Sequence, residues 1–251
     1  MIGIPTLIQE QNSYAGVTNK RLGGKAKKIC VAYEGMERFF AQDKILFTGN
    51  PIRRASVEIT GKREEALNFF GLNNAKKTIL VTGGSLGANT LNLCVRQALT
   101  MLRDADVQVI WQCGGYYADS LKVELNDELP NNVKLYPFLD RMDYAYAAAD
   151  IVVSRAGAAT ISELCVVGKP VVLVPSPNVA EDHQTKNADA LVKKNAAILV
   201  KDSDAKSSLI ATVLSTLKDP DKCDLLGHEI KKMAKVDADD VIANEVLKLI
   251  R

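Results

Sequence analysis

The sequence predicts an α/β protein built on a doubly wound parallel sheet, and three features of the chain lead to this prediction. From Lys77 onward, short apolar segments alternate with segments of helical periodicity, which is typical of repeated strand–helix units. The apolar segments consist almost entirely of Val, Ile and Leu, as expected for strands that helices bury on both faces. With 251 residues, of which 47% are hydrophobic, the chain can also enclose a full core.

Six strands are predicted in this region of the chain, and helical segments separate them. The strand candidates are 78–82, 107–112, 133–138, 151–154, 171–174 and 197–200. The helix candidates between them are 91–102, 117–125, 142–149, 160–167 and 184–194. Beyond Lys201 the pattern is helical, with candidates at 207–217, 223–234 and 239–249. In such sheets ligands bind beyond the carboxyl ends of the strands.

The first 50 residues follow a different pattern. One strand is predicted within residues 4–12 and another at 29–32, but two strands do not form a stable domain by themselves. The sequence Gly49-Asn50-Pro51 is typical of a linker, since proline restricts the residue before it. We therefore expect residues 1–48 to be the remnant of a domain whose earlier portion is missing, residues 49–236 to be a complete α/β domain, and residues 237–251 to be a helix that packs back toward the remnant.

The composition argues against several classes of protein. A formal net charge of only +2 disfavours a dedicated nucleic-acid-binding protein, whose surface is usually strongly basic. The five cysteines are scattered and form no Cys-x-x-Cys pair, which favours a reducing compartment. No apolar segment approaches the roughly 20 residues of a membrane span, and no signal peptide is recognised. We therefore expect a cytoplasmic protein.

A glycine-rich turn, Gly83-Gly84-Ser85-Leu86-Gly87, follows the first predicted strand of the sheet. By itself it is equally compatible with a tight strand-to-helix crossing and with a phosphate site. The next strand ends at Gln112-Cys113 without the acidic residue that would bind a ribose, and the turn lacks the Gly-x-Gly-x-x-Gly spacing, so a nicotinamide-dependent oxidoreductase is disfavoured. A Walker P-loop is disfavoured because no Gly-Lys-Ser/Thr sequence follows.

Segment 154–163 is a more specific indicator of a phosphate site. Gly157 would let the backbone approach a ligand closely, and the amides of residues 158–160 would point outward from a helix start, where unpaired N–H groups and the helix dipole favour a diphosphate. Glu163, about one turn further on, is placed to accept hydrogen bonds from two ribose hydroxyls. The alternative is that Glu163 is a first-turn acid that only stabilises the helix dipole.

A third polar sequence, Asp182-His183-Gln184, follows a proline-bounded loop at residues 175–177. We interpret Asp182 as a helix N-cap. The Gln184 amide both donates and accepts hydrogen bonds, which suits a pair of sugar hydroxyls. For His183 we favour a structural or exposed role over that of a catalytic base.

The charged residues indicate no metal site. Asp202 and Asp204 precede a predicted helix and are interpreted as capping residues. We expect helix N-termini and an arginine, for which we choose Arg53, to hold a diphosphate without a metal ion or cofactor. A basic segment could contact membrane phosphates, but we favour a solvated helix face. Its members are Lys20, Arg21, Lys25, Lys27 and Lys28.

Five motifs taken together resemble the bacterial MurG family, and the resemblance spans nearly the whole chain. It implies the GT-B arrangement of two Rossmann-like domains, with the carboxyl-terminal one complete here and only a remnant of the other. It also implies an inverting, metal-independent hexosyltransferase of peptidoglycan and cell wall synthesis, which transfers GlcNAc from UDP-GlcNAc to lipid I and so makes lipid II at the cytoplasmic face of the cell membrane. The motifs are Glu10-Gln11-Asn12 with Gly16-Val17-Thr18-Asn19-Lys20, Gly49-Asn50-Pro51-Ile52-Arg53, Gly83-Gly84-Ser85-Leu86-Gly87-Ala88, the run from Arg155 to Leu164, and the run from Asp182 to Ala188.

The resemblance further implies roles for single residues. The family's first glycine-rich loop, which carries the histidine proposed as the base, has no counterpart in this sequence, so the catalytic residue is unknown. Asn12 would lie on the acceptor side. The donor site would consist of Arg53 and Ser85 at the diphosphate, the Leu139 backbone at the uracil, Ala158, Ala159 and Thr160 at the phosphates, Glu163 at the ribose, and His183 and Gln184 at the GlcNAc hydroxyls.

Two alternatives stay open beside this interpretation. One is a donor-binding fragment or subunit without transferase activity of its own, which would need a separate chain to supply the acceptor domain. An upstream reading frame that carries the missing loop would identify a split enzyme. The other is an epimerase that uses UDP-GlcNAc on the same architecture, which the acceptor-type sequence Glu10-Gln11-Asn12 disfavours.

Overall fold

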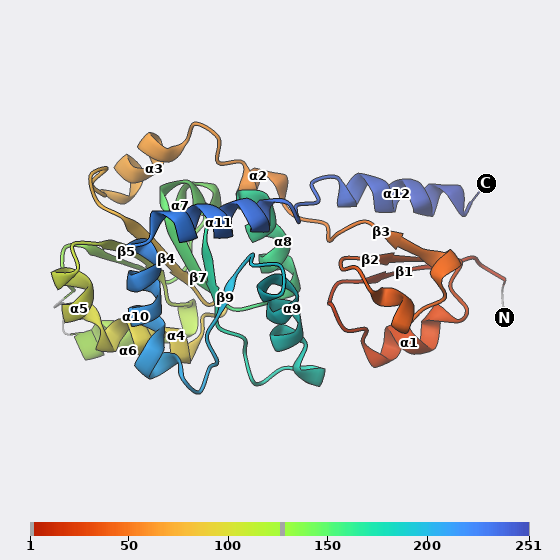
Figure 1. Cartoon of the computed structure of the whole chain (residues 1–251), viewed down its shortest axis with the longest axis horizontal. Helices are drawn as coiled ribbons and strands as arrows, with labels where there is room; N and C mark the ends of the chain where they lie inside the picture. Colours follow the sequence, from red (N-terminus) through yellow and green to blue (C-terminus); the bar gives the residue numbers. More distant parts are fainter. Residues whose placement is uncertain (1–2, 126–128, 251) are drawn as a thin grey trace.

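The computed structural model describes residues 3–125 and 129–250. The first two residues of the predicted remnant and the last residue of the predicted carboxyl-terminal helix segment therefore lie outside the described residues. The described chain contains two parallel sheets, one of three strands and one of six. Figure 1 shows the smaller sheet at one end of an elongated molecule and the larger sheet, with its helices, at the other.

The six-stranded sheet has the order β6-β5-β4-β7-β8-β9, and every neighbouring pair is parallel. This is the order 3-2-1-4-5-6 of a Rossmann fold, which confirms the predicted doubly wound sheet. The sequence predicts all six strands to within a few residues. Their bounds are β4 Thr78–Thr82, β5 Gln108–Gln112, β6 Val133–Tyr136, β7 Ile151–Ser154, β8 Val171–Leu173 and β9 Ile198–Leu199.

Helices cover both faces of this sheet, as the uniformly apolar strands predicted. Leu80 and Ile110 belong to a core cluster shared with α3, α7, α8 and α9, whereas Ile79 and Trp111 belong to a second cluster shared with α4, α6 and α10. The helix bounds are α2 Arg54–Val57, α3 Arg63–Phe70, α4 Asn89–Gln97, α5 Leu99–Asp104, α6 Gly115–Leu125, α7 Met142–Ala148, α8 Ala158–Val167, the 3₁₀ turn η3 Ala180–Asp182, α9 His183–Val192, α10 Ala205–Leu217, α11 Pro220–Lys231 and α12 Ala238–Lys248.

The three-stranded sheet contains one strand more than the sequence predicted. The strands β1 Leu7–Glu10, β2 Lys28–Val31 and β3 Ile45–Phe47 lie side by side in that order and are parallel. The sequence analysis did not predict β3, because its apolar run is only three residues long. Ile29 of β2 is buried in one cluster with Met36 and Phe40, which lie in the segment between β2 and β3. The remaining elements are α1 Val17–Gly23 and the 3₁₀ turns η1 Met36–Arg38 and η2 Gln42–Lys44.

Two helix predictions need correction. The predicted helix 91–102 is divided into α4 and α5, because Ala98 has a non-helical backbone with φ −104° and ψ 11°. The basic segment is not a single helix face either. Only Lys20 and Arg21 lie on α1, which ends at Gly23, and Lys28 begins strand β2.

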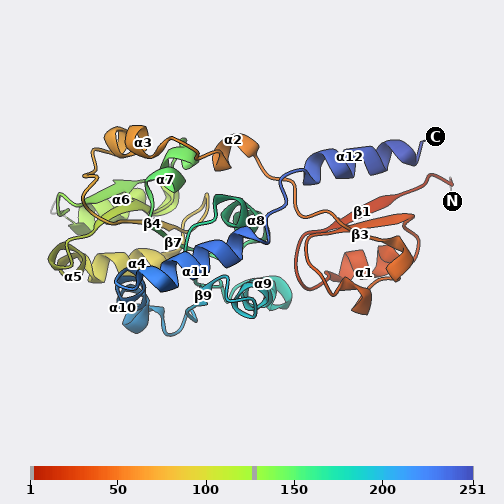
Figure 2. The same ribbon diagram turned by 45° about the horizontal axis from the view of Figure 1, so that its top comes forward.

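The last helix, α12, lies beside β3 in both views of the molecule (Figures 1 and 2). The Nζ atom of Lys235, just before this helix, lies 4.6 Å from the centroid of the Phe47 ring. Arg54 forms an ion pair of 2.8 Å with Asp239 in the first turn of α12. Gly49 is packed so closely that a Cβ atom there would lie 2.4 Å from the Lys235 Cβ. The chain therefore crosses between its two sheets twice, near Gly49 and near Lys235.

Candidate functional site

Three polar residues end adjacent strands at one edge of the six-stranded sheet. Thr82 of β4 is in register with Gln112 of β5 on one side and with Ser154 of β7 on the other. The Thr82 hydroxyl donates a hydrogen bond of 2.6 Å to Oε1 of Gln112. The strand order reverses between β4 and β7, and ligands of such sheets bind at this point, between the turns that diverge there. We refer to the region beyond the carboxyl ends of β4 and β7 as the crevice.

The glycine-rich turn after β4 is held firmly at its base and exposed at its tip. Gly84 and Gly87 have positive φ angles of 81° and 78°, and a Cβ atom on Gly87 would lie 2.0 Å from the Cys113 carbonyl oxygen. The Gly84 carbonyl accepts a hydrogen bond of 3.0 Å from Gln112. Ser85, the predicted diphosphate contact, is exposed at the tip. The turn thus places exposed backbone and the exposed Ser85 beyond the carboxyl end of β4, without a bulky side chain at its base.

The turn after β7 opens helix α8. Gly157 occupies the N-cap position in an extended conformation, and the first intrahelical hydrogen bond runs from the Ile161 N–H to the Gly157 carbonyl oxygen at 2.9 Å. The N–H groups of Ala158, Ala159 and Thr160 therefore have no partner within the helix. Together with the helix dipole, they form a site that favours an anion.

Glu163 lies in the second turn of α8, half-buried beside Tyr146 of α7. The Tyr146 hydroxyl donates a hydrogen bond of 3.2 Å to Glu163 Oε2. Burial raises the pKa of the Glu163 carboxyl, while the Tyr146 hydrogen bond and the positive charge of Arg53 lower it to a smaller extent. The alternative interpretation of Glu163 as a first-turn acid is wrong, because α8 begins at Ala158 and has no acidic residue in its first turn.

Arg53 is exposed at the start of α2 and close enough for its charge to act on Glu163. No sequence motif contains both Arg53 and Glu163, since they lie in different segments of the chain. The structure brings the linker arginine and the α8 carboxylate to one place. Tyr146, which the sequence analysis did not select, completes this group.

The start of helix α9 differs from the capping prediction. Asp182 is at the N-cap position, but its carboxylate accepts a hydrogen bond of 2.6 Å from the Thr185 hydroxyl and makes no cap bond to the backbone. Glu181 and Asp182 both have left-handed φ angles, 55° and 51°. Such angles in residues other than glycine are unfavourable and mark a segment whose conformation the surroundings impose.

Gln184 joins the turns that follow two neighbouring strands. Its Oε1 atom accepts hydrogen bonds from the N–H of Ser176 at 2.8 Å and from the N–H of Ala156 at 3.2 Å. No described residue accepts a hydrogen bond from its Nε2 group, which is thus free to donate to a ligand. His183 lies next to it, half-buried, with Nδ1 2.8 Å from the Ala180 carbonyl oxygen. This tether agrees with a structural role for the imidazole.

Leu139 and Asn12 occupy different environments. Leu139 follows β6 with a buried side chain, and within residues 3–125 and 129–250 its backbone N–H and carbonyl have no protein hydrogen bond. Asn12 is engaged between the two sheets: its Oδ1 accepts a hydrogen bond of 3.0 Å from Asn187, and its N–H donates to Glu10 at 3.0 Å.

Two further residues form the frame of the site and were not selected from the sequence. Asn187 of α9 is fully buried, and its Oδ1 accepts a hydrogen bond of 2.8 Å from the Ser13 N–H. Arg155 forms a 2.5 Å ion pair with Asp202 and also donates to the Val174 carbonyl oxygen at 3.0 Å. The prediction that Asp202 caps a helix is therefore wrong. Asp204 does occupy the N-cap position of α10, but its side chain makes no cap bond. Asn187 and Arg155 both lie within the motifs named in the sequence analysis, but their hydrogen-bond and ion-pair partners could be identified only from the fold.

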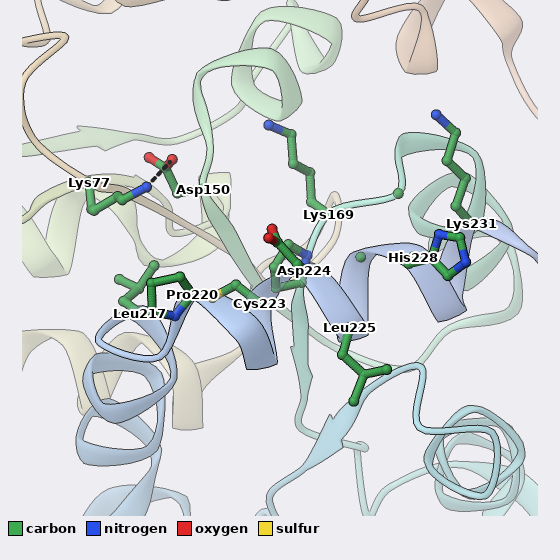
Figure 3. Close-up of a pocket in the computed structure, with 13 residues that line it drawn as sticks. Lys77, Asp150, Lys169, Leu217, Pro220, Cys223, Asp224, Leu225, His228 and Lys231 are labelled. Carbon is green, nitrogen blue, oxygen red and sulfur yellow. Dashed lines mark hydrogen bonds and ion pairs between the residues drawn. The ribbon is translucent and has the colours of Figure 1, made fainter.

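A separate pocket of about 800 Å³ lies at the opposite edge of the sheet (Figure 3). Lys77, Asp150 and Lys169 line it, and they directly precede or nearly precede strands β4, β7 and β8. Figure 3 shows the ion pair between Lys77 and Asp150, 3.3 Å long, on one side and His228 of α11 on the other. This pocket is at the amino ends of the strands and thus apart from the crevice. In the portion of the chain that the structure describes, no cluster of three His, Cys, Asp or Glu residues could hold a metal ion.

Comparison with known proteins identifies the family. The glycosyltransferase family 28 C-terminal domain matches residues 78–243. A Parabacteroides distasonis protein named UDP-N-acetylglucosamine--N-acetylmuramyl-(pentapeptide) pyrophosphoryl-undecaprenol N-acetylglucosamine transferase is 56% identical, with 99% of this chain and 67% of the relative covered. A Flavobacterium psychrophilum protein of the same name is 50% identical, with 100% and 67% covered.

The solved structures agree. Acinetobacter baumannii MurG matches this fold with a TM-score of 0.78 and 30% identity, over 98% of this chain and 67% of that one. The structure of Anabaena Alr3699/HepE in complex with UDP and glucose is only 16% identical at a TM-score of 0.60, over 98% of this chain and 71% of that one, and shows the shared fold alone. This chain spans about two thirds of the length of the curated relatives named above. It belongs to the MurG family of glycosyltransferases and has the α/β, Rossmann-like architecture of the GT-B fold.

Proposed function

We propose that the crevice at the carboxyl ends of β4 and β7 binds UDP-GlcNAc as a sugar donor. The observation that carries this proposal is the open start of α8, where three backbone N–H groups lie without helical partners one turn before the half-buried Glu163. An anion-binding helix start next to a carboxylate acceptor suits a diphosphate joined to a ribose. The names of the relatives supply the identity of the donor.

Within this proposal each residue has a defined task. The exposed Arg53 and Ser85 contact the diphosphate, and the free Leu139 peptide binds the uracil. Glu163 accepts hydrogen bonds from the ribose hydroxyls. The Gln184 Nε2 group donates to a GlcNAc hydroxyl, and His183 lies beside it. The diphosphate oxygens bind at Ala158, Ala159 and Thr160.

As a portion of a MurG-type transferase, the chain would pass GlcNAc to lipid I and form lipid II. The acceptor hydroxyl oxygen attacks the anomeric carbon while the bond to the diphosphate breaks, so the configuration inverts and UDP leaves. The helix start of α8 stabilises the negative charge that develops on the departing diphosphate. The residues around the crevice contribute to catalysis by holding the donor in one orientation. No residue of this chain is assigned as the base that takes the acceptor proton, and Asn12 is proposed to lie on the acceptor side.

We also propose that the protein acts on the cytoplasmic face of the cell membrane, where lipid I is its acceptor. None of the helices within residues 3–125 and 129–250 is long and apolar enough to cross a bilayer. The proposed contact with the membrane surface is peripheral. The basic residues Lys20 and Arg21 on α1 are suited to contacts with lipid phosphates.

A second candidate function is donor binding without transfer. It is favoured by one observation, that this chain spans about two thirds of the length of the relatives. In that case a separate chain would supply the acceptor site. Incubation with UDP-GlcNAc and lipid I separates the two: lipid II formation by the purified chain supports the transferase, whereas donor binding without lipid II supports the second candidate.

Calorimetric titration with UDP-GlcNAc tests the donor site directly. We expect UDP-GlcNAc to bind, UDP-glucose to bind with lower affinity, and NADH not to bind. Glu163→Ala should weaken binding at least about tenfold, since hydrogen bonds to a charged group contribute about 1.5–3 kcal/mol. Glu64→Ala, which removes an exposed carboxylate on α3, serves as the control and should bind like the original protein. No binding by a folded protein would refute the assigned site.

A further inference from the structure

Tyr146 of α7 contacts the carboxylate of the proposed donor site but is too deeply buried to contact a ligand in the crevice. The residue is only 1% exposed, and it belongs to the core cluster that also contains Ile161 and Leu164 of α8. Its hydroxyl donates a hydrogen bond of 3.2 Å to Oε2 of Glu163. The donating group is therefore held in place by the core, whereas the Glu163 side chain that accepts from it is only half-buried.

The Tyr146 hydroxyl is a constant donor to this carboxylate. Burial raises the pKa of Tyr146 well above its usual value, and the charge of Glu163 and the hydrogen bond to it act in the same direction. The hydroxyl therefore keeps its proton at neutral pH. Arg53 acts on Glu163 through its charge alone, without a hydrogen bond. Of these two groups, only Tyr146 gives the carboxylate a direction, because a hydrogen bond depends strongly on angle.

This hydrogen bond restricts a side chain that would otherwise be mobile. A glutamate has several rotatable bonds, and ordering them costs conformational entropy. The bond to Tyr146 uses only part of the acceptor capacity of the carboxylate, so Oε1 and the remainder of Oε2 can still accept from two hydroxyls. An acceptor that is ordered before the ligand arrives loses less entropy when it binds, and it therefore binds more tightly.

We propose that Tyr146 is a positioning residue of the donor site, which holds the Glu163 carboxylate in the orientation that accepts both ribose hydroxyls. The site then prefers ribonucleotides to nucleotides without these hydroxyls more strongly than Glu163 alone would allow. The inference rests on the proposed function, because it requires Glu163 to bind the ribose. A tyrosine that only supported the fold would not affect this preference.

Titration with UDP and with 2′,3′-dideoxy-UDP, which lacks both ribose hydroxyls, tests the proposal. We expect the original protein to bind UDP at least about tenfold more tightly than 2′,3′-dideoxy-UDP. Tyr146→Phe keeps the buried ring and removes only the hydroxyl. It should weaken UDP binding by roughly fivefold and leave the affinity for 2′,3′-dideoxy-UDP unchanged, so that the preference for UDP falls by the same factor.

The same helix contains a matched control. The Tyr144 hydroxyl also donates to a glutamate, but this partner, Glu65, lies on α3. Tyr144→Phe should therefore leave both affinities unchanged. In a Glu163→Ala background, Tyr146→Phe should have no further effect on UDP binding, because a residue that acts only through Glu163 then has nothing left to position.

A second variant tests the position of the carboxylate while the tyrosine stays intact. Glu163→Asp keeps the charge but withdraws the carboxylate from Tyr146 by one methylene group. We expect it to lower the preference for UDP nearly as far as Glu163→Ala does. This result does not depend on the folding of the Tyr146→Phe variant.

Three results would overturn the inference. They are an unchanged or increased preference for UDP in the folded Tyr146→Phe variant, an equal loss of affinity for both nucleotides in that variant, and a full preference for UDP in Glu163→Asp. Each of them leaves the donor site standing as long as Glu163→Ala removes the preference. If the original protein binds both nucleotides equally well, or binds neither, the ribose contact itself is refuted, and the assigned donor site fails together with the inference.

Discussion

At the scale of single residues, Glu163 shows how the fold holds the carboxylate that we propose binds the ribose. The carboxylate is half-buried on α8, which disfavours its charged form and raises its pKa. Tyr146 donates one hydrogen bond to it, and the carboxylate can accept further hydrogen bonds, as the proposed contact with ribose hydroxyls requires. The sequence identified Glu163 from its distance to Gly157. It could not identify Tyr146, because that contact joins two different strand–helix units.

The raised pKa of Glu163 predicts a specific pH dependence of stability. A carboxyl whose pKa is higher in the folded than in the unfolded protein stabilises the fold below its unfolded pKa, near 4.5, and this contribution is lost as the pH rises through the folded value. Glu163→Gln, which stays neutral, should therefore be more stable than the original protein at pH 7, by less than about 1 kcal/mol.

Urea unfolding at several pH values measures this difference. The stability difference between Glu163→Gln and the original protein should shrink as the pH falls. It should disappear below about pH 4, where the Glu163 carboxyl is protonated in both the folded and the unfolded protein. Glu64→Gln, at an exposed position on α3, should show no such trend. An advantage of Glu163→Gln that persists unchanged at low pH would contradict the assignment of the raised pKa.

At the scale of elements, strand ends and the turns that follow them carry most of the residues of the proposed donor site. Strands 78–82 and 151–154 were predicted with the bounds that the structure has, because their β-branched runs are bordered by polar or glycine residues. Two local features escaped prediction. The short strand β3 carries too few residues for a recognisable pattern, and the break at Ala98 depends on packing, since alanine itself favours helix.

The turn after β4 allows a comparison between two glycines with the same backbone requirement. Gly84 and Gly87 both have positive φ, but a Cβ atom on Gly84 would meet open space, whereas one on Gly87 would collide with the Cys113 carbonyl oxygen. We expect Gly84→Ala to cost about 1–2 kcal/mol through backbone strain alone. Gly87→Ala should cost more, because the turn must also move away from β5.

Thermal unfolding and UDP-GlcNAc titration of both variants check this prediction. Gly87→Ala should lower both the melting temperature and donor affinity more than Gly84→Ala does. Equal effects of the two substitutions would show that the close approach of Gly87 to Cys113 does not restrain the turn.

At the scale of the whole molecule, polar side chains connect the smaller sheet to the larger one. Asn187 of α9 accepts a hydrogen bond from the Ser13 N–H and donates to Asn12. Asn50 donates to the Gln11 carbonyl oxygen at 3.0 Å and to the Ser162 hydroxyl at 3.1 Å. These bonds place the predicted acceptor-side segment next to α8 and α9. The division into residues 1–48, 49–236 and 237–251 stays a prediction.

Asn187→Ala should loosen this connection. The substitution leaves the buried Ser13 N–H without its acceptor, so we expect a loss of about 2 kcal/mol in the free energy of unfolding. Hydrogen exchange should also accelerate around Ser13 more than within β4. Asn68→Ala, on the exposed side of α3, is the control and should leave both measurements unchanged. Equal exchange at Ser13 in both variants would show that Asn187 is not what holds this segment.

Local patterns of residues were enough to predict the strand–helix alternation and the parallel sheet, because hydrophobic periodicity and turn chemistry act between residues close in the chain. They also selected Glu163 and Gln184, whose roles in binding stay predictions. The folded chain was needed to show which strands are neighbours, that Tyr146 and Arg53 act on Glu163, that Arg155 pairs with Asp202, and that Asn187 binds the Ser13 peptide. Those contacts join segments up to 174 residues apart. Their partners are selected by the packing of the folded chain, and no local pattern of residues specifies them.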